Sequence, residues 1–304
     1  MKNITENGCY ADVKTAVALG IFDGVHIGHR VVFDKVKGYA NKGFAPAVFT
    51  FVTESITQKH EKNYKFIISN DDKLNFLQNY GIEYVCCTQF DEIKDLSGDE
   101  FVRQILLKKI NAAVVACGPE FRFGKNASCG VDDLLSMSKK YGFDVEIVDP
   151  IKIDNTLVSS TVIKSYISKG DIRRANDFLG YRFGIKQPVV HGNEIGRTIN
   201  FPTINQNFLT DQIIPRFGVY ASQTVIDGVI YTSISNIGVK PTICNIAVPL
   251  AETHILGCSR DLYGRQIEVT FSDFIRDECR FRSIDELRSQ IDTDIKAAIA
   301  SGGK

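Results

Sequence analysis

The sequence lacks the features by which two large classes of protein are recognised. Lys and Arg together number 36, as do Asp and Glu, so the formal net charge is zero. A basic excess or basic stripe of the kind that binds nucleic acid is missing. Apolar stretches long enough to cross a bilayer are missing as well. We therefore expect neither a nucleic-acid partner nor a membrane partner.

Two further absences concern the compartment in which the protein works. Residues 1–7 contain no apolar segment of the kind found in a secretory signal peptide. The eight cysteines include no Cys-x-x-Cys pair. Cys86 and Cys87 are adjacent within an apolar run, which is typical of buried, reduced thiols rather than disulfides. A cytoplasmic location is the expectation.

The chain also has no phosphate-binding loop of the form Gly-x-x-x-x-Gly-Lys-[Ser/Thr], no internal repeat and no low-complexity tract. Any phosphate site is therefore not of the P-loop kind. The chain does have 304 residues, of which 44% are hydrophobic and 24% charged. This is the balance of a soluble protein with a core, and the length favours two domains of about 150 residues. The sequence carries no signal of oligomeric state.

Short apolar segments alternate with helical segments in the first half. Strands are expected over residues 17–21, 47–52, 84–88, 113–117 and 144–148, and helices over residues 29–42, 70–80, 98–108 and 132–141. Such alternation predicts βαβ units and a parallel, Rossmann-like sheet, whose ligands bind at the carboxyl ends of the strands. Residues 159–181 follow as a helical segment with a break at Gly170.

The pattern changes after about Gly180. Residues 183–274 are short strands separated by turn signals, of which Asp227-Gly228 is a strong two-residue hairpin signal. This series predicts a small antiparallel β-barrel. We therefore divide the chain into a domain of residues 1–180 and a domain of residues 181–304.

A single helix is expected to close the chain. Ser283 and Glu286 have the spacing of a capping box at its start. One apolar face is expected along it, made of Ile284, Leu287, Ile291 and Ile295.

The segment from Gly20 to His29 reads Gly-Ile-Phe-Asp-Gly-Val-His-Ile-Gly-His and falls where a strand passes into a helix. Helix N-termini attract anions, and imidazoles there can donate hydrogen bonds to phosphate oxygens. Two alternatives are open for this segment alone. One is a glycine-rich turn with two surface histidines. The other is a metal site, which is disfavoured because the remaining histidines show no ligand spacing with this pair: His60, His191 and His254.

Two later segments add to this one. Gly118-Pro119-Glu120-Phe121-Arg122-Phe123-Gly124 follows a predicted strand, and Ser159-Ser160-Thr161-Val162-Ile163-Lys164 opens a predicted helix. Together, in this order, the three segments resemble the His-x-Gly-His nucleotidyltransferases, in particular the FMN adenylyltransferase module of bacterial riboflavin biosynthesis proteins. The resemblance implies that His26 and His29 are catalytic. It also implies an ATP site made of Gly20, Phe22, Asp23, Gly28, Gly118, Glu120, Arg122, Ser160 and Lys164.

The chain departs from this family at three places. Val52-Thr53-Glu54-Ser55 stands where the family commonly has Asp-Pro-His-Pro, Glu120 stands where Asp or Asn is usual, and Lys164 replaces an Arg. Lysine lacks the planar fork with which arginine holds two phosphate oxygens. These departures bear on the rate of adenylylation more than on its existence.

A second set of motifs lies in the other half. Gly192-Asn193-Glu194-Ile195-Gly196-Arg197 is followed by Phe201-Pro202-Thr203-Ile204-Asn205. Closely spaced glycines can form a flap over phosphates, and the Thr203 hydroxyl and Asn205 amide oxygen are hard ligands suited to Mg²⁺. From about Tyr181 to Asp294 the sequence resembles riboflavin kinase. Departures at Gln187-Pro188 and Gly257-Cys258 are interpreted as structural.

The resemblance to riboflavin kinase implies a role for each motif residue. Glu252 would accept the proton of the riboflavin 5′-hydroxyl, and Thr203 and Asn205 would hold Mg²⁺ beside ATP. Further contacts to ATP or flavin are implied for Gly192, Gly196, Arg197, Pro202 and Arg276, the last on a loop that closes over the flavin. Without this context, the favoured interpretation of Glu252 is a solvated strand residue and that of Arg276 a surface cation.

Together the two resemblances imply a bifunctional transferase that makes flavin cofactors. Riboflavin is phosphorylated by ATP to FMN, and FMN is adenylylated by a second ATP to FAD with release of pyrophosphate. Mg²⁺ is the implied cofactor, and riboflavin, FMN and ATP are the implied small-molecule partners. One alternative is a monofunctional riboflavin kinase with a weak or inactive nucleotidyltransferase domain. Another is a flavin-binding or regulatory module without turnover, against which the set Thr203, Asn205 and Glu252 argues.

Overall fold

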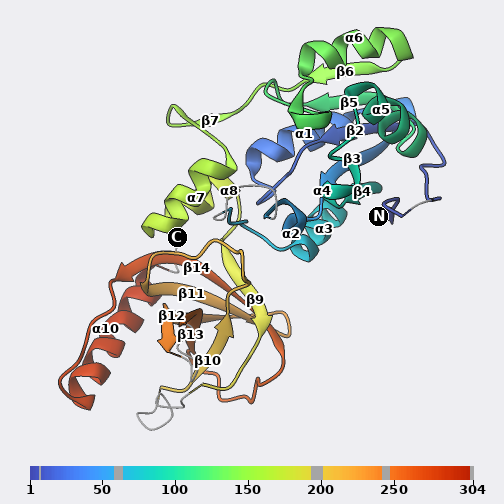
Figure 1. Ribbon diagram of the computed structural model, residues 1–304. Coiled ribbons are helices and arrows are strands. Elements are labelled where there is room, and N and C mark those ends of the chain that lie inside the picture. Colours follow the sequence, from blue (N-terminus) through green and yellow to red (C-terminus); the bar gives the residue numbers. More distant parts are fainter. Residues whose placement is uncertain (7, 58–63, 193–200, 242–246, 302–304) are drawn as a thin grey trace. The chain divides into compact units, whose positions relative to one another are not determined.

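The structure is a computed structural model that describes all 304 residues except 7, 58–63, 193–200, 242–246 and 302–304 (Figure 1). The chain forms two compact units, Met1–Ser160 and Thr161–Lys304. Within the described ranges, no helix combines the length and apolar character needed to span a membrane.

The first unit is built on a six-stranded sheet in the order β1-β4-β3-β2-β5-β6, and all of its pairings are parallel. The strands are β1 (Lys2–Asn3), β2 (Thr15–Leu19), β3 (Ala45–Phe51), β4 (Tyr84–Thr88), β5 (Ala112–Cys117) and β6 (Asp144–Ile147). The parallel, Rossmann-like sheet expected from the alternating pattern is confirmed. The short edge strand β1 was not expected from the sequence, because two residues carry no periodicity.

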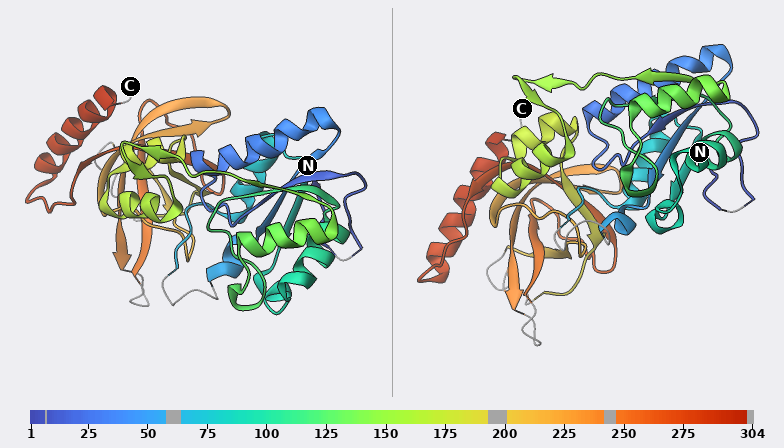
Figure 2. Two further views of the ribbon diagram at one scale, coloured as in Figure 1. Left: turned by 90° about the horizontal axis from the view of Figure 1, so that it is seen from above. Right: turned by 45° about the horizontal axis from the view of Figure 1, so that its top comes forward.

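Helices cover both faces of this sheet, because side chains alternate along each buried strand. Ala16 and Ala18 of β2 face a cluster with α1 (Ile27–Gly38) and α3 (Asn70–Asn79). Val17 and Leu19 face the opposite cluster, which includes η2 (Phe101–Lys109) and α6 (Val131–Tyr141). Figure 2 shows the blue α1 and the green α6 on opposite sides of the strands.

Most predicted helices of this unit are found, with two differences in type. The segment expected as one helix over residues 98–108 is a short α5 (Gly98–Glu100) that continues as the π-helix η2. The helix expected to reach Lys42 ends at Gly38 and continues as a 3₁₀ turn, Tyr39–Lys42. Short elements fill the connections: α2 (Thr53–Thr57), α4 (Phe90–Ile93), η3 (Lys125–Ala127), β7 (Lys152–Ile153) and β8 (Thr156–Leu157).

The strand order locates the ligand edge of the sheet. The chain passes from β2 outward to β3 and β4, and then returns to the other side of β2 for β5 and β6. The order therefore reverses between β2 and β5, and open α/β sheets bind ligands beside the carboxyl ends of such strands. The histidine motif follows β2, and the segment that begins at Gly118 follows β5.

The second unit contains a six-stranded antiparallel sheet in the order β10-β13-β12-β11-β14-β9. Its strands are β9 (Gly184–Pro188), β10 (Thr203–Asn207), β11 (Gly218–Ile226), β12 (Val229–Pro241), β13 (Ala247–Ile255) and β14 (Gln266–Arg276). A bridge between Val190 and Asn205 brings the chain after β9 beside β10. The Gln206 side chain also donates to the carbonyl of Gln187 on β9. The sheet is thus a nearly closed barrel, as predicted.

The predicted Asp227-Gly228 hairpin joins β11 to β12, and its two turn residues have φ of 51° and 79°. Positive φ at both positions is the signature of the type I′ turn, whose twist matches the flanking strands. The C-terminal helix is α10 (Ile284–Ser301), drawn in red beside the barrel in Figure 1.

Two expectations about α10 need correction. Ser283 accepts a hydrogen bond from the Glu286 amide at 3.2 Å. The Glu286 carboxylate accepts from the Arg282 amide instead of that of Ser283, so the reciprocal half of the capping box is absent. Ile291 and Ile295 pack on the barrel, but Ile284 is 58% exposed. The apolar face of α10 therefore begins later than predicted, because the first turn of the helix extends beyond the barrel surface.

The helical segment between the halves consists of α7 (Ser160–Lys169) and α8 (Ile172–Leu179), with Gly170 at φ +81° between them. The predicted break at Gly170 is confirmed. From Thr161 onward this segment belongs to the compact unit of the barrel. The functional division at residue 180 stays a prediction.

Candidate active sites

The turn after β2 holds strained backbone at the ligand edge of the sheet. Phe22, Gly24 and Val25 all lie in the left-handed region, with φ of 55°, 80° and 39°. For residues with a Cβ this conformation is costly and clusters at functional sites. The Phe22 ring packs on Phe33 in the core. A Cβ on Gly20 would lie 2.8 Å from that ring, so glycine is required there.

The two histidines of the motif lie face to face at the start of α1. Their ring centroids are 3.4 Å apart and their planes differ by 21°. His26 is the N-cap residue, and its Nδ1 accepts a hydrogen bond from the His29 amide. In a neutral ring the hydrogen of His26 therefore lies on Nε2. A Cβ on Gly28 would lie 3.2 Å from the His26 ring, which explains the glycine between the histidines.

Each imidazole has one ring nitrogen that is not satisfied by the described residues. Nε2 of His26 and Nδ1 of His29 are buried and have no hydrogen-bond partner among the described residues. Burial lowers the pKa of His26 to about 4. Burial, together with the neighbouring His26 and Lys73, holds the pKa of His29 well below its usual range. Both rings are neutral near pH 7 and offer unpaired polar atoms at an anion-binding helix N-terminus.

Asp23 and Ser160 connect the turn to other parts of this unit. The Asp23 carboxylate accepts hydrogen bonds from the Ile67 amide at 2.8 Å and from the Tyr64 hydroxyl at 3.3 Å. The Ser160 hydroxyl donates to the Asp23 carbonyl at 2.9 Å. The structure thus brings Ser160, the first residue of α7, to the histidine motif, and it gives Asp23 a role in shaping the turn.

The segment after β5 is arranged differently from what its residue types suggest. Arg122 donates two hydrogen bonds to the Ala127 carbonyl, at 3.1 and 2.9 Å, and so closes its own loop. Glu120 is exposed, and a Cβ on Gly118 would meet open space. Lys164 lies on α7 within the other compact unit. Contacts of these four residues with ATP stay predictions.

The segment that replaces Asp-Pro-His-Pro forms the junction between β3 and α2. Ser55 donates to the Val52 carbonyl at 2.7 Å, and Thr53 is buried. Asn70, at the start of α3, accepts a hydrogen bond from the Thr53 amide and donates one from its own amide to Glu54. The replacement therefore ties two elements together at the ligand edge.

In the barrel, the predicted kinase residues share one face of neighbouring strands. Thr203 and Asn205 are two positions apart on β10, so their side chains lie on the same face of the strand. Asn205 is directly opposite Glu252 of β13. Asn236 of β12 is opposite Glu252 on the other side. A Cβ on Gly192 would lie 2.4 Å from the Asn205 amide nitrogen, so glycine lets the backbone approach that side chain. The structure thus brings Gly192, Thr203, Asn205 and Glu252 together.

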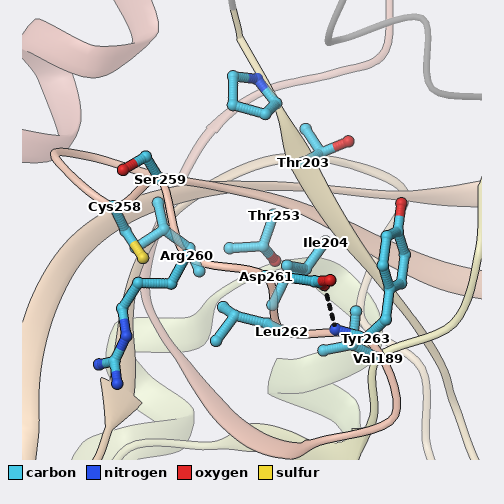
Figure 3. A pocket seen from close by; sticks show the side chains of 12 residues that line it. Val189, Thr203, Ile204, Thr253, Cys258, Ser259, Arg260, Asp261, Leu262 and Tyr263 are labelled. Atoms are coloured by element: carbon cyan, nitrogen blue, oxygen red, sulfur yellow. Dashed lines mark hydrogen bonds between the residues drawn. The ribbon is translucent and has the colours of Figure 1, made fainter.

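A pocket of about 280 Å³ opens beside these strands (Figure 3). Pro202, Thr203 and Ile204 line one part of it, and the loop of residues 258–263 lines another. The loop is held by a hydrogen bond from the Tyr263 amide to Asp261, drawn as a dashed line in Figure 3. The pocket lies beside a strand that is predicted to bind phosphates. Its volume is suited to part of a nucleotide.

Arg276 forms an ion pair within the second unit. At the end of β14 its guanidinium donates to both carboxylate oxygens of Asp294 on α10, at 2.8 to 3.1 Å. Asp294 is 1% exposed, so this is a largely buried ion pair. The structure therefore places Arg276 between barrel and helix, and a role for it over the flavin stays a prediction. Gly196 and Arg197 lie outside the described residues.

Comparison with known proteins decides the family. The family model for FAD synthetase matches residues 10–162, and that for riboflavin kinase matches residues 179–301. A bifunctional riboflavin kinase/FMN adenylyltransferase from Haemophilus influenzae is 33% identical over 94% of this chain and 93% of its own length. The corresponding proteins of Escherichia coli K12 and Bacillus subtilis are 34% and 33% identical over 91% and 94% of this chain, and over 90% and 92% of their own lengths. The chain belongs to the bifunctional riboflavin kinase/FMN adenylyltransferase family.

A solved structure resembles this member of the family along almost its whole length. It is the crystal structure of a protein from Streptococcus pneumoniae that is named as a macrolide-efflux protein. That protein is 28% identical, with a TM-score of 0.85 over 98% of this chain and 97% of its own. Both halves of the enzyme match a catalytic family model. This supports a bifunctional transferase over the monofunctional alternative and over a module without turnover.

Two features of the sites of this enzyme were missed at the level of sequence. Lys73 is 0% exposed, and its ammonium donates to the Phe51 carbonyl at the end of β3 at 2.5 Å. Its charge helps to lower the pKa of His29. This effect has no sequence signal, because a lysine in a helix is usually solvated. Cys258 was interpreted as structural, but it lines the pocket beside Thr203. Only the folding of the loop onto β10 reveals this.

Proposed function

We propose that the barrel phosphorylates riboflavin with ATP, and that the parallel-sheet unit then transfers AMP from a second ATP to the FMN, giving FAD and pyrophosphate. The observation that carries the proposal is the presence of two chemically distinct sites. One is the stacked, unpartnered imidazole pair at the switch point. The other is the Asn205 and Glu252 pair on the barrel strands.

The adenylylation site supplies hydrogen-bond donors rather than a nucleophile. An FMN phosphate oxygen attacks the α-phosphorus of ATP, and the bond to the bridging oxygen of pyrophosphate breaks. Negative charge builds on that oxygen, where the Nε2–H of His26 and the free amides at the start of α1 stabilise it. Because both histidines are neutral and buried, these donors need little reorganisation during the reaction.

The kinase site supplies a base and positions its substrates. Glu252 accepts the proton of the riboflavin 5′-hydroxyl while that oxygen attacks the γ-phosphorus of ATP. Thr203 and Pro202 line the pocket in which we place part of the nucleotide. The backbone at Gly192 keeps the Asn205 side chain in place.

The residues present fit a magnesium ion held largely by nucleotide phosphates. Thr203 and Asn205 offer two neutral oxygen ligands on one strand face, close to the Glu252 carboxylate. Elsewhere in the part of the chain that the structure describes, His, Cys, Asp and Glu form no cluster of three that could hold a metal. Mg²⁺ is commonly bound through one or two protein oxygens together with phosphates, and it offsets their charge.

The substrates in this proposal are riboflavin, FMN and ATP, without a nucleic-acid or membrane partner. We place the enzyme in the cytoplasm. The free and buried thiols of Cys86, Cys87 and Cys117 agree with a reducing compartment.

The test is to incubate the protein with riboflavin, ATP and Mg²⁺ and to separate the flavins by chromatography. FAD is the expected product, with FMN as the intermediate. FMN alone would show that the first unit does not turn over, and unchanged riboflavin would contradict the kinase assignment.

A single substitution separates the two reactions. Glu252→Gln removes the base, so we expect it to abolish FMN formation while conversion of supplied FMN to FAD stays near the wild-type rate, because sites in separate units behave independently. Equal loss of both activities in a folded Glu252→Gln protein would contradict the assignment of the base.

A further inference from the structure

The barrel interior holds a continuous chain of five buried hydroxyl groups. Thr224 Oγ1 lies 2.9 Å from Ser233 Oγ, which lies 2.9 Å from Ser222 Oγ. Ser222 Oγ lies 2.8 Å from Ser235 Oγ, which lies 2.8 Å from Thr253 Oγ1. All five residues are at most 2% exposed. The chain crosses β11, β12 and β13 on the inner face of the sheet.

Counting hydrogens shows that such a chain is unbalanced. Each hydroxyl donates one hydrogen, and the five hydroxyls are joined by four bonds. When all donors point the same way, one hydrogen is left over at one end. The surplus can also lie on a hydroxyl inside the chain when donors converge on it from both sides, but there, too, it would be a buried donor without an acceptor.

Contact with the pocket decides where the surplus lies, because Thr224 and Thr253 are both 0% exposed. Thr224 is 0% exposed and has Ser233 as its single hydrogen-bond partner within the described ranges. A surplus hydrogen there would be a buried donor without an acceptor, which is costly. Thr253 also has one protein partner among the described residues, Ser235, but it lines the pocket beside Thr203 (Figure 3). The favoured direction therefore leaves the free donor at the pocket.

An unpaired acceptor lies on the inner face of the same strand pair. Gln206 and Thr253 both face the barrel interior, two positions apart across the β10–β13 pair. The Gln206 amide nitrogen donates to the carbonyls of Gln187 and Ile267, which fixes the orientation of the amide. Its Oε1 is buried and has no partner among the described residues. The inner face of this strand pair therefore carries a second polar group that the described residues do not satisfy.

We propose that Thr253 is a positioning residue of the kinase, and that its hydroxyl donates a hydrogen bond to an acceptor atom of the ATP bound in this pocket. The inference rests on the proposed function, in which the pocket holds part of that nucleotide. Because the other four hydroxyls all donate toward Thr253, the chain orients this hydroxyl as a donor before the nucleotide arrives and strengthens its bond. The oriented Thr253 hydroxyl therefore affects the binding of ATP and not the chemical step.

The experiment compares kinetic constants of three variants of the full-length protein. Thr253→Val keeps the shape and removes the donor; we expect the KM for ATP in riboflavin phosphorylation to rise about tenfold, with kcat within about twofold of wild type. Thr253→Ser restores the hydroxyl and should return the KM to within about twofold. Thr224→Val shortens the chain at its far end but leaves Thr253 bonded to Ser235, so it should raise the KM less than Thr253→Val does.

Two internal controls guard against loss of folding and against failure of the site assignment. The KM for ATP in adenylylation of supplied FMN should not change in any of these variants, and a thermal melt checks that they fold. Thr203→Val tests the pocket itself. If Thr203→Val impairs phosphorylation but Thr253→Val leaves its KM for ATP unchanged, the role of Thr253 is overturned. If neither variant affects phosphorylation, the nucleotide does not occupy this pocket, and the proposed kinase site fails with it.

Discussion

Buried polar atoms without partners are rare in folded proteins, and at residue scale this enzyme places two of them on stacked imidazoles. The arrangement is built by small residues: Gly28 makes room for the His26 ring, and the left-handed Val25 turns the chain into α1. His26 has a double role, because its Nδ1 caps the helix while its Nε2 is left for a ligand. These two roles can be separated by mutation.

His26→Asn should keep the cap and remove the Nε2–H donor, because asparagine is a good N-cap residue. We expect kcat for conversion of FMN to FAD to fall about 100-fold or more, with a smaller change in KM for ATP, since the donor acts mainly on charge in the transition state. Riboflavin phosphorylation should not change. His26→Ala, the matched comparison, should lose similar activity and about 1 kcal/mol of stability as well. An Asn variant as fast as wild type would mean that the histidine only shapes the turn.

The same histidines predict how stability depends on pH. Their pKa values are lowered in the folded state, for His26 to about 4, so below pH 6.5 the unfolded chain binds more protons than the folded one. The free energy of unfolding should therefore decrease as pH falls from about 6.5 toward 4, by up to about 1.4 kcal/mol per pH unit for each histidine. Urea denaturation between pH 7.5 and 5 measures this, and a variant with Asn at both positions should show a weaker dependence.

At the scale of elements, the end of β14 and the helix α10 are joined by one ion pair. Arg276 and Asp294 make a two-pronged contact in which the carboxylate is almost fully buried. A buried carboxylate is tolerated only when it is paired. This contact holds α10 on the barrel together with Ile291 and Ile295, which pack against Ala221 and Ile234.

Arg276→Met should therefore destabilise the second unit by about 3–5 kcal/mol, because it leaves the Asp294 charge buried and unpaired. The double variant Arg276→Met/Asp294→Leu should recover much of that loss. Denaturation curves of the two variants and the wild type provide the comparison. If Arg276→Met abolishes phosphorylation at unchanged stability, the arginine instead acts on the flavin, as its family resemblance implies.

At the scale of the whole molecule, the barrel does not form a compact unit by its strands alone. Asn176 of α8 accepts a hydrogen bond from the Phe183 amide at 2.7 Å and donates one to the Phe271 carbonyl at 2.9 Å. Arg173 forms an ion pair with Asp273 at 2.5 Å. Phe178 of α8 is fully buried. The helices before residue 181 thus cover part of the barrel.

A fragment of residues 161–304 should accordingly fold and phosphorylate riboflavin, because it keeps the contacts made by α7 and α8. A fragment of residues 181–304 lacks Asn176 and Phe178 and should be less stable by several kcal/mol, since a large side chain is lost from the core and buried backbone groups lose their partners. Thermal melts and FMN formation by the two fragments test this. Equal stability of the fragments would place the boundary at residue 180, as the change of sequence pattern suggests.

Much of this molecule is determined by local sequence. The alternation of apolar segments predicts the parallel sheet, because the helices and strands of βαβ units carry different periods. Asp227-Gly228 specifies its hairpin, because both positions need positive φ. The glycines around His26 and His29 mark the first site for the same kind of reason, since steric limits act between residues close in the chain.

Tertiary structure alone decided the features that depend on contacts between distant segments. Three features follow from which strands and loops become neighbours: the burial of Lys73 against the Phe51 carbonyl, the place of Cys258 in the pocket and the hydroxyl chain that ends at Thr253. A serine or threonine in a strand has the same local signal whether its hydroxyl faces solvent or another hydroxyl. Pairing of the barrel strands brings these groups within hydrogen-bond distance, and exclusion of water from the interior then gives their contacts an energetic consequence.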